Sequence, residues 1–206
     1  MIKNQKLSTT RVVRTPSLAE AMLDNLITPS VTTSTVVKAA LVVFGSLLLA
    51  ASAQLKIPLY PVPVTGQTLV VLLIGMTYGL RLGAITIAAY LFEGALGLPV
   101  FAGGAAGAAV LMGPTGGYLF GFLLAGAAMG YLAERGMGRT VDSTIVAMLI
   151  GNFVIYLCGA SWLANFIGFD QAIAAGVLPF LYGDVLKLVV AVGLMPLAWR
   201  AVNALK

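Results

Sequence analysis

Two charged side chains lie three residues apart in FLYGDVLKLVV, an apolar stretch at residues 180–190. On a helix, Asp184 and Lys187 would share one face. A carboxylate beside an ammonium suits a ligand that carries N–H donors at one part and an anionic carboxylate at another. The other interpretation is an ion pair that only tethers this segment to a neighbour, although ionisable residues inside apolar segments more often mark a ligand or ion path.

A third charge in an apolar run is Glu93. Two interpretations stay open for it: a salt bridge with Lys56 or Lys187, or a polar wall of the same ligand pocket. Three further stretches are expected to contribute to that pocket: PVPVTGQ with Thr65 and Gln67, the Gly-rich FAGGAAGAA, and GPTGGY. Glycine leaves peptide groups unobstructed, which makes Gly103 and Gly104 candidate ligand contacts. Nearby aromatic residues are Tyr60, Phe101, Tyr118, Phe180 and Tyr182.

The composition shows which class of protein must position these groups. Of 206 residues, 60% are hydrophobic and 9% are charged, whereas soluble domains carry about 25% charged residues. Mean hydropathy is +1.00. The apolar residues form long unbroken runs rather than alternating segments of about ten, which favours helices over a barrel. The chain is therefore predicted to be an all-α integral membrane protein.

Charges and prolines divide the chain into a polar tail and a membrane domain. Residues 1–35 are predicted to be a cytoplasmic tail, with PSLAEAMLDNLI as an alternative short interfacial helix. Residues 36–206 are predicted to form a bundle of six transmembrane helices, with a very tight turn at Arg81-Leu82. A loop is expected over 99–117. The predicted helices span about 36–55, 64–80, 82–98, 115–133, 143–164 and 177–200.

Lys and Arg are distributed asymmetrically across this topology. With the N-terminus inside, Lys56 is the one basic residue of these helices and loops on the outer side, and ten others are cytoplasmic. The positive-inside rule then places both termini in the cytoplasm and the pocket on the outer side of the cytoplasmic membrane. The predicted protein is multi-pass, and its dispersed basic residues argue against nucleic-acid binding.

Several activities are excluded by missing residues. The chain has no His, a single cysteine at Cys158, and no Lys followed by Ser or Thr. A His/Cys metal site, a Ser–His hydrolase and a Walker A loop are therefore absent. We expect neither an enzyme nor a cofactor, and ATP hydrolysis would need another subunit. Gly45, Ser46 and Ala50 give small residues at helical spacing, either for docking a partner helix or for internal packing.

Five ordered blocks resemble the BioY proteins, the biotin-binding S-components of energy-coupling factor (ECF) transporters. They are AQLKIPLYPVPVTGQTL, GLRLGA, YLFEGALGLPVFAGG, GPTGGYLFGF and VLPFLYGDVLK. The resemblance covers about residues 38–200. It implies that Asp184 accepts hydrogen bonds from the ureido N–H groups of biotin and that Lys187 lies near the valerate carboxylate. Where some members carry polar side chains, this chain has GGAAGAA, and Gln67 or peptide groups at Gly103 and Gly104 would substitute.

The resemblance also implies partners: an ECF transmembrane coupling protein and two cytoplasmic ATPase subunits, with biotin captured outside and released inside by toppling of the bundle. Operation alone or as a homo-oligomer stays open. Two other functions are also open at this point. One is a proton-coupled carrier of a small carboxylate that acts alone and uses Glu93 and Asp184 as a relay. The other is a membrane scaffold in which Asp184 and Lys187 form only a tether.

Overall fold

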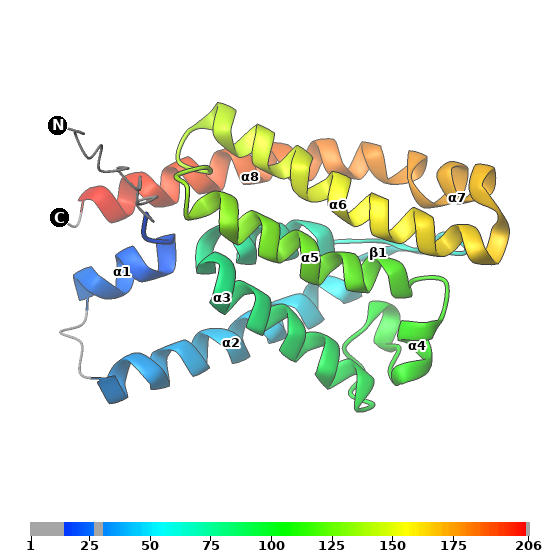
Figure 1. The fold of residues 1–206 in the computed structure, drawn as a ribbon, viewed down its shortest axis with the longest axis horizontal. Helices are drawn as coiled ribbons and strands as arrows, with labels where there is room; N and C mark the ends of the chain where they lie inside the picture. The colour runs from blue at the N-terminus through cyan, green and yellow to red at the C-terminus, as the bar shows by residue number, and fades with distance from the viewer. Residues whose placement is uncertain (1–14, 27–30, 205–206) are drawn as a thin grey trace, which may run out of the picture.

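The computed structural model describes residues 15–26 and 31–204 of the chain. Within them, long helices lie side by side, and one short two-stranded ladder accompanies them (Figure 1). The elements are α1 (Leu18–Leu26), α2 (Val31–Gln54), β1 (Lys56–Ile57), β2 (Val64–Thr65), α3 (Gln67–Ala95), η1 (Ala102–Gly104), α4 (Ala108–Met112), α5 (Gly116–Ala133), α6 (Val141–Ile167), α7 (Phe169–Gly176) and α8 (Leu178–Ala204).

Helix length and polarity agree with a membrane location. Among the described residues, five helical stretches are long and apolar enough to cross a membrane. Each reaches or exceeds 18 residues with a mean hydropathy of 1.4 or more, close to the roughly 20 apolar residues that span the hydrocarbon layer. The all-helical class predicted from composition is confirmed. The five stretches are Thr35–Gln54, Gln67–Ala95, Gly116–Ala133, Val141–Ile167 and Phe169–Ala204.

Helix α3 is a helical hairpin and not one straight rod. The Gln67 amide nitrogen donates to the Tyr90 hydroxyl at 2.7 Å, although 23 residues of continuous helix would separate them by about 35 Å. The chain reverses at Gly79, whose φ of 80° and ψ of −179° are not helical. The sequence-based prediction of a turn at Arg81-Leu82 is therefore wrong by two residues. The reason is that only glycine adopts this backbone conformation without strain.

Glycines bring α3 and α5 into backbone contact. A Cβ atom built on Gly75 would lie 2.4 Å from the Gly126 carbonyl oxygen, and one built on Gly130 would lie 2.4 Å from the Leu80 nitrogen. No side chain larger than hydrogen fits at either position without a shift of the facing backbone. The hairpin therefore packs directly against α5. This contact fixes the position of the first residues of α3.

Two proline-rich or glycine-rich connections differ from the prediction. The helix expected from residue 64 begins at Gln67, because Val64 and Thr65 pair instead with Lys56 and Ile57 in the antiparallel ladder. Prolines at 61 and 63 favour extended backbone for this stretch. The segment expected to be a loop over 99–117 contains the short helices η1 and α4. A further short helix, α7, lies between α6 and α8, where the prediction had none.

Part of the predicted tail is helical. PSLAEAMLDNLI contains α1, where the Ser17 backbone nitrogen donates to Glu20 Oε2 at 2.9 Å and the Glu20 backbone nitrogen donates to Ser17 Oγ at 3.3 Å, as in a capping box. Leu18 and Ala21 are buried. The rest of the predicted tail, 1–14 and 27–30, lies outside the described residues. Helix α2 already begins at Val31 rather than near 36.

The two ends of the bundle differ. The ladder, α4 and α7 lie at one end, and α1 lies at the other beside the last turns of α8 (Figure 1). Thr15 donates from its hydroxyl to the Glu134 carbonyl at 2.8 Å, and this joins the start of the described chain to the end of α5. The candidate site lies at the end that contains the ladder.

Candidate functional site

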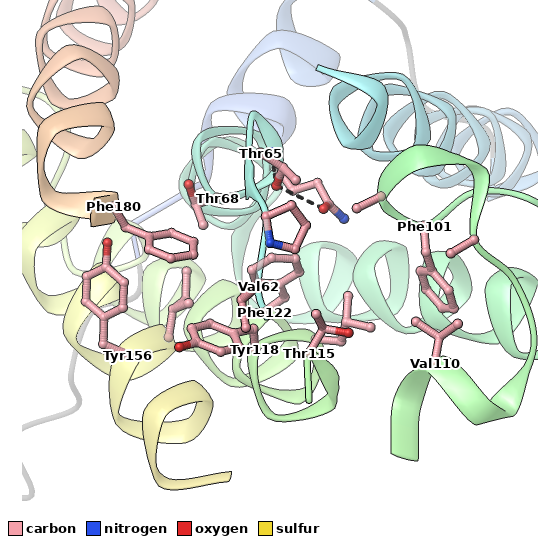
Figure 2. Close-up of a pocket in the computed structure, with 16 residues that line it drawn as sticks. Val62, Thr65, Thr68, Phe101, Val110, Thr115, Tyr118, Phe122, Tyr156 and Phe180 are labelled. Carbon is pink, nitrogen blue, oxygen red and sulfur yellow. Dashed lines mark hydrogen bonds between the residues drawn. The ribbon is translucent and has the colours of Figure 1, made fainter. Parts of the chain in front are cut away.

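A partly enclosed cavity of about 180 Å³ lies at the ladder end of the bundle. Its walls come from the segment before α3, the first turns of α3 and α5, the segment around η1, α4, α6 and the start of α8 (Figure 2). The lining is mostly apolar. Three of the predicted site residues, Gln67, Phe101 and Tyr118, line it.

One wall of the cavity is aromatic. The Phe180 ring stacks on Tyr118 with centroids 6.0 Å apart and planes 8° apart. Tyr156 meets Phe180 edge-on, with a centroid distance of 6.2 Å and an interplanar angle of 78°. The Tyr118 hydroxyl donates to the Gly176 carbonyl at 2.7 Å. These rings offer a flat apolar face to a ring-shaped ligand.

The predicted charged pair lies directly behind this wall. Lys187 Nζ is 3.3 Å from Asp184 Oδ1, so the two side chains share one face of α8 as their spacing suggested. Neither residue lines the cavity itself. Each instead contacts a residue that does: Lys187 Nζ donates to Thr68 Oγ1 at 2.7 Å, and the Tyr156 hydroxyl donates to Asp184 Oδ2.

The opposite wall is built on Phe101, which is 1% exposed. Its ring meets Tyr90 edge-on at 5.7 Å. The Tyr90 hydroxyl accepts from the Gln67 amide and donates to the Val100 carbonyl at 3.0 Å. The Thr65 hydroxyl donates to Gln67 Oε1 at 3.0 Å (Figure 2). Gln67 therefore ties the start of α3 to the segment that carries Phe101.

Gly94 makes room for the Phe101 ring. A Cβ atom on Gly94 would lie 2.1 Å from Phe101 Cζ. Gly94→Ala is therefore expected to displace the Phe101 ring and to deform this wall of the cavity. Ligand affinity should fall by about 10-fold or more, as for overpacking that costs roughly 1–3 kcal/mol. Titration calorimetry on the purified variant measures this effect. Adding Phe101→Leu should restore part of the affinity, and an unchanged affinity in Gly94→Ala alone would contradict the packing argument.

Other predicted site residues lie away from the cavity lining. Gly103 and Gly104 are in η1, where φ values of 71° and 77° favour glycine, and they shape the segment rather than line the cavity. Glu93 accepts from the Ser46 hydroxyl, with 2.7 Å to each carboxylate oxygen. Its contact is therefore with α2, and neither Lys56 nor Lys187 is the partner that the structure shows for it.

Two aromatic residues expected near the pocket are solvent- or lipid-facing. Tyr60 is 93% exposed and Tyr182 is 86% exposed, and neither lines the cavity. Tyr182 follows Phe180 by two residues on α8, which turns its side chain to a different side of the helix. The expectation was wrong for Tyr182 because helical phase turns its side chain away from the wall, and it was wrong for Tyr60 because the exposed connection between β1 and β2 carries this residue.

The predicted docking face on α2 also needs correction. Ser46 is 1% exposed, and a Cβ atom on Gly45 would lie 2.6 Å from Thr86 Cγ2. Ala50 packs against the buried core. Gly45 and Ser46 therefore face α3, and Ala50 packs against the core. Internal packing, the alternative interpretation, accounts for these three small residues. The exposed side of α2 instead carries large apolar residues, among them Val43, Phe44 and Leu47.

Sequence reasoning did not name three polar residues of the lining, Thr68, Thr115 and Tyr156. Thr68 follows Gln67 directly and lies inside the block AQLKIPLYPVPVTGQTL. Its place in that block could have marked it as a candidate pocket residue. Tyr156 lies in a mostly apolar stretch of α6, and the sequence reasoning did not single it out. Its role becomes visible only from its contact with Asp184, 28 residues away.

Comparisons with known proteins agree on one family. The family model described as "BioY family" matches residues 24–204. "Probable biotin transporter BioY" of Pyrococcus horikoshii is 42% identical over 145 residues, covering 70% of this chain and 85% of the relative. "Biotin transporter BioY" of Thermotoga maritima is 42% identical over 146 residues, with the same coverage of 70% and 85%.

A solved structure shares the fold. It is described as the S-component for biotin from an ECF-type ABC transporter, and it matches with a TM-score of 0.75 and 25% identity. The match covers 84% of this chain and 95% of that one.

Proposed function

Because this chain belongs to the BioY family, we propose that it binds biotin and captures it for uptake across the cytoplasmic membrane. Like its family, it is a transport protein and not an enzyme. The proposal rests above all on the cavity: an aromatic wall backed by a carboxylate–ammonium pair of which the carboxylate is buried and the ammonium partly buried, in a chain similar to named biotin transporters. Apolar walls with a few placed polar groups are typical of small-molecule sites.

We infer six membrane crossings with both termini in the cytoplasm. Counting the two arms of α3 separately raises the five apolar stretches to six. The α1 end of the bundle carries cationic side chains: Arg139 donates to the Pro16 carbonyl at 3.4 Å and lies 4.3 Å from the Trp199 ring centroid. Arg81 follows the Gly79 turn, and Lys56 lies in β1 at the cavity end. The positive-inside rule then points the cavity outward.

For the ligand, we propose that the fused ring system lies against Tyr118 and Phe180 and that its polar groups lie toward Asp184 and Lys187. Phe101 and Gln67 would close and brace the opposite wall, with Gly103 and Gly104 shaping the segment that carries Phe101. This places the apolar rings of biotin on aromatic faces and its hydrogen-bonding groups near the charged pair.

Energy for uptake would come from other subunits. The chain has no phosphate-binding Lys-Ser or Lys-Thr sequence, and the fold it shares with an ECF-type S-component supports an ECF transmembrane coupling protein and cytoplasmic ATPases as partners. The proposed sequence of events is capture of biotin at the outer face and release inside after the bundle changes its orientation in the membrane.

Biotin titration into the detergent-purified chain tests the binding step. We expect stoichiometric binding, with an increase in thermal stability that grows with biotin concentration. Lipoate, an acid with a sulfur ring but no ureido group, is the matched control and should bind far more weakly. Folded protein that gives neither heat nor stabilisation with biotin would overturn the proposal.

Uptake into proteoliposomes tests energisation. The chain alone should bind labelled biotin without accumulating it, whether or not a pH gradient is imposed. Accumulation should require the coupling protein and ATPases with ATP. Accumulation driven by a pH gradient in the chain alone would favour the proton-coupled carrier instead.

A further inference from the structure

Glu134 joins two segments that are far apart in the chain. Its backbone carbonyl accepts from the Thr15 backbone nitrogen at 2.9 Å and from the Thr15 hydroxyl at 2.8 Å. Its carboxylate oxygen Oε1 accepts from the Leu80 backbone nitrogen at 2.9 Å, directly after the Gly79 turn. The C-cap residue of α5 therefore holds the start of the described chain through its backbone and the turn of the α3 hairpin through its side chain.

The same first residues contact the turn and α8. A Cβ atom on Gly79 would lie 3.1 Å from Ser17 Cβ, and Ser17 is buried. The Arg139 guanidinium donates to the Pro16 carbonyl at 3.4 Å and also lies over the ring of Trp199, which is 6% exposed. The segment is thus bound to the α3 turn and, through the guanidinium, to the last turns of α8.

Helix α1 packs against this end of the bundle as well. It contacts α3 and α8, and it lies beside the last turns of α8 (Figure 1). Leu18 and Ala21 are 6% and 3% exposed, whereas Met22 is 40% exposed. One side of the helix is therefore buried, and the other side faces away from the bundle.

The contact of α1 with the bundle is small. Over residues 18–24, Leu18 and Ala21 are the two buried side chains, and alanine adds little apolar area. Hydrogen bonds supply the remainder, and each adds little net stability. Elements with few buried apolar contacts open before the rest of a protein. Most of α1 also precedes residue 24, where the match to the BioY family begins.

We propose that residues 15–26 form a detachable strap that locks the α3 turn to the ends of α5 and α8, and that release of the strap exposes the buried surface around Trp199. Release separates Arg139 from the Pro16 carbonyl and removes the apolar side of α1 from this end of the bundle. The inference depends neither on the ligand nor on which side of the membrane this end faces.

A single engineered thiol measures whether the strap is docked. Cys158 is the one cysteine of the chain, so a Cys158→Ser background allows one thiol to be placed on either side of α1. In detergent, a maleimide should modify the Ala21→Cys protein about 10-fold more slowly than the Met22→Cys protein, because the buried position reacts only while the strap is open. Equal rates would show that the strap is not docked and would overturn the proposal.

Leu18→Asp should release the strap, because it places an unpaired carboxylate in an apolar contact. In the Ala21→Cys background it should raise the maleimide rate to that of Met22→Cys. Met22→Asp, the same change on the exposed side, should leave the rate unchanged. Cys158, in the chain without an engineered thiol, should react equally fast with and without Leu18→Asp, which separates release of the strap from general unfolding. An unchanged rate in Leu18→Asp would contradict the proposed packing of α1.

Quenching of tryptophan fluorescence tests whether release exposes the surface beneath. The chain has two tryptophans, so Trp162→Phe leaves Trp199 as the single fluorophore. Quenching by acrylamide should increase several-fold in Leu18→Asp and stay the same in Met22→Asp. Unchanged quenching together with a faster thiol reaction would show that the strap leaves without uncovering Trp199, and would overturn that part of the proposal.

Biotin titration is a separate readout. The cavity lies at the other end of the α3 hairpin, about 18 Å from Gly79 along the first arm at roughly 1.5 Å per residue. Leu18→Asp should therefore bind biotin like the unchanged chain, and a parallel loss of affinity would contradict a local strap. If the unchanged chain binds no biotin, the proposed function fails, while the thiol and quenching results still decide whether the strap exists.

Discussion

Lys187→Met is expected to lower the affinity for biotin by about 100-fold and to lower the temperature of thermal unfolding. The ammonium is the cationic partner of Asp184, whose side chain is buried, and the donor to Thr68. Removing it leaves an uncompensated carboxylate, and breaking a buried pair in this way costs about 3–5 kcal/mol. It also removes the charge that polarises the Thr68 hydroxyl. Calorimetry and thermal unfolding in detergent measure the two effects.

A double-mutant cycle measures the interaction free energy between Asp184 and Lys187. Asp184→Asn combined with Lys187→Met removes both charges, so the double variant should be more stable than the sum of the two single changes predicts. It should still bind biotin poorly. Lys56→Met, which removes one exposed cation at the same end of the bundle, should unfold like the unchanged chain. Strict additivity of the two single variants would show that Asp184 and Lys187 do not interact.

Gly75→Ala is expected to lower the stability of the bundle strongly for so small a change. The new methyl group would lie 2.4 Å from the Gly126 carbonyl oxygen and 2.7 Å from Met129 Cβ. Both belong to α5, and a backbone carbonyl within a helix cannot move aside as a flexible side chain can. The α3 hairpin would have to separate from α5, at a cost of about 1–3 kcal/mol or more, and the cavity residues at the start of α3 would move with it.

Gly193→Ala is the matched control, because a Cβ atom there meets nothing within 4 Å. It also lies inside a long helix, α8. The unfolding temperature of Gly193→Ala should be unchanged or higher, since alanine favours helix over glycine. A Gly75→Ala protein as stable as Gly193→Ala would show that the α3–α5 contact is looser than the structure indicates.

The site illustrates how far sequence reasoning reaches. Spacing alone indicated that Asp184 and Lys187 share a face, and the structure has them 3.3 Å apart. The spacing did not show that Thr68 and Tyr156, which line the cavity, contact this pair. The sequence left two interpretations of Glu93 open, a salt bridge with Lys56 or Lys187 and a wall of the same pocket, but the residue contacts Ser46 on α2. A buried charge marks an unusual position, and its partner depends on which helix lies opposite.

The membrane class, the approximate helix ranges and the charged pair could all be read from the chain. These properties follow from runs of apolar residues and from the cost of burying a charge, and both act along a single segment. The turn at Gly79, the use of Gly45 and Ser46 in internal packing, and the contacts of Thr68 and Tyr156 with the charged pair came only from the folded molecule. Lys187 meets Thr68 across 119 residues, and a contact at that separation depends on how helices pack together, which no local pattern encodes.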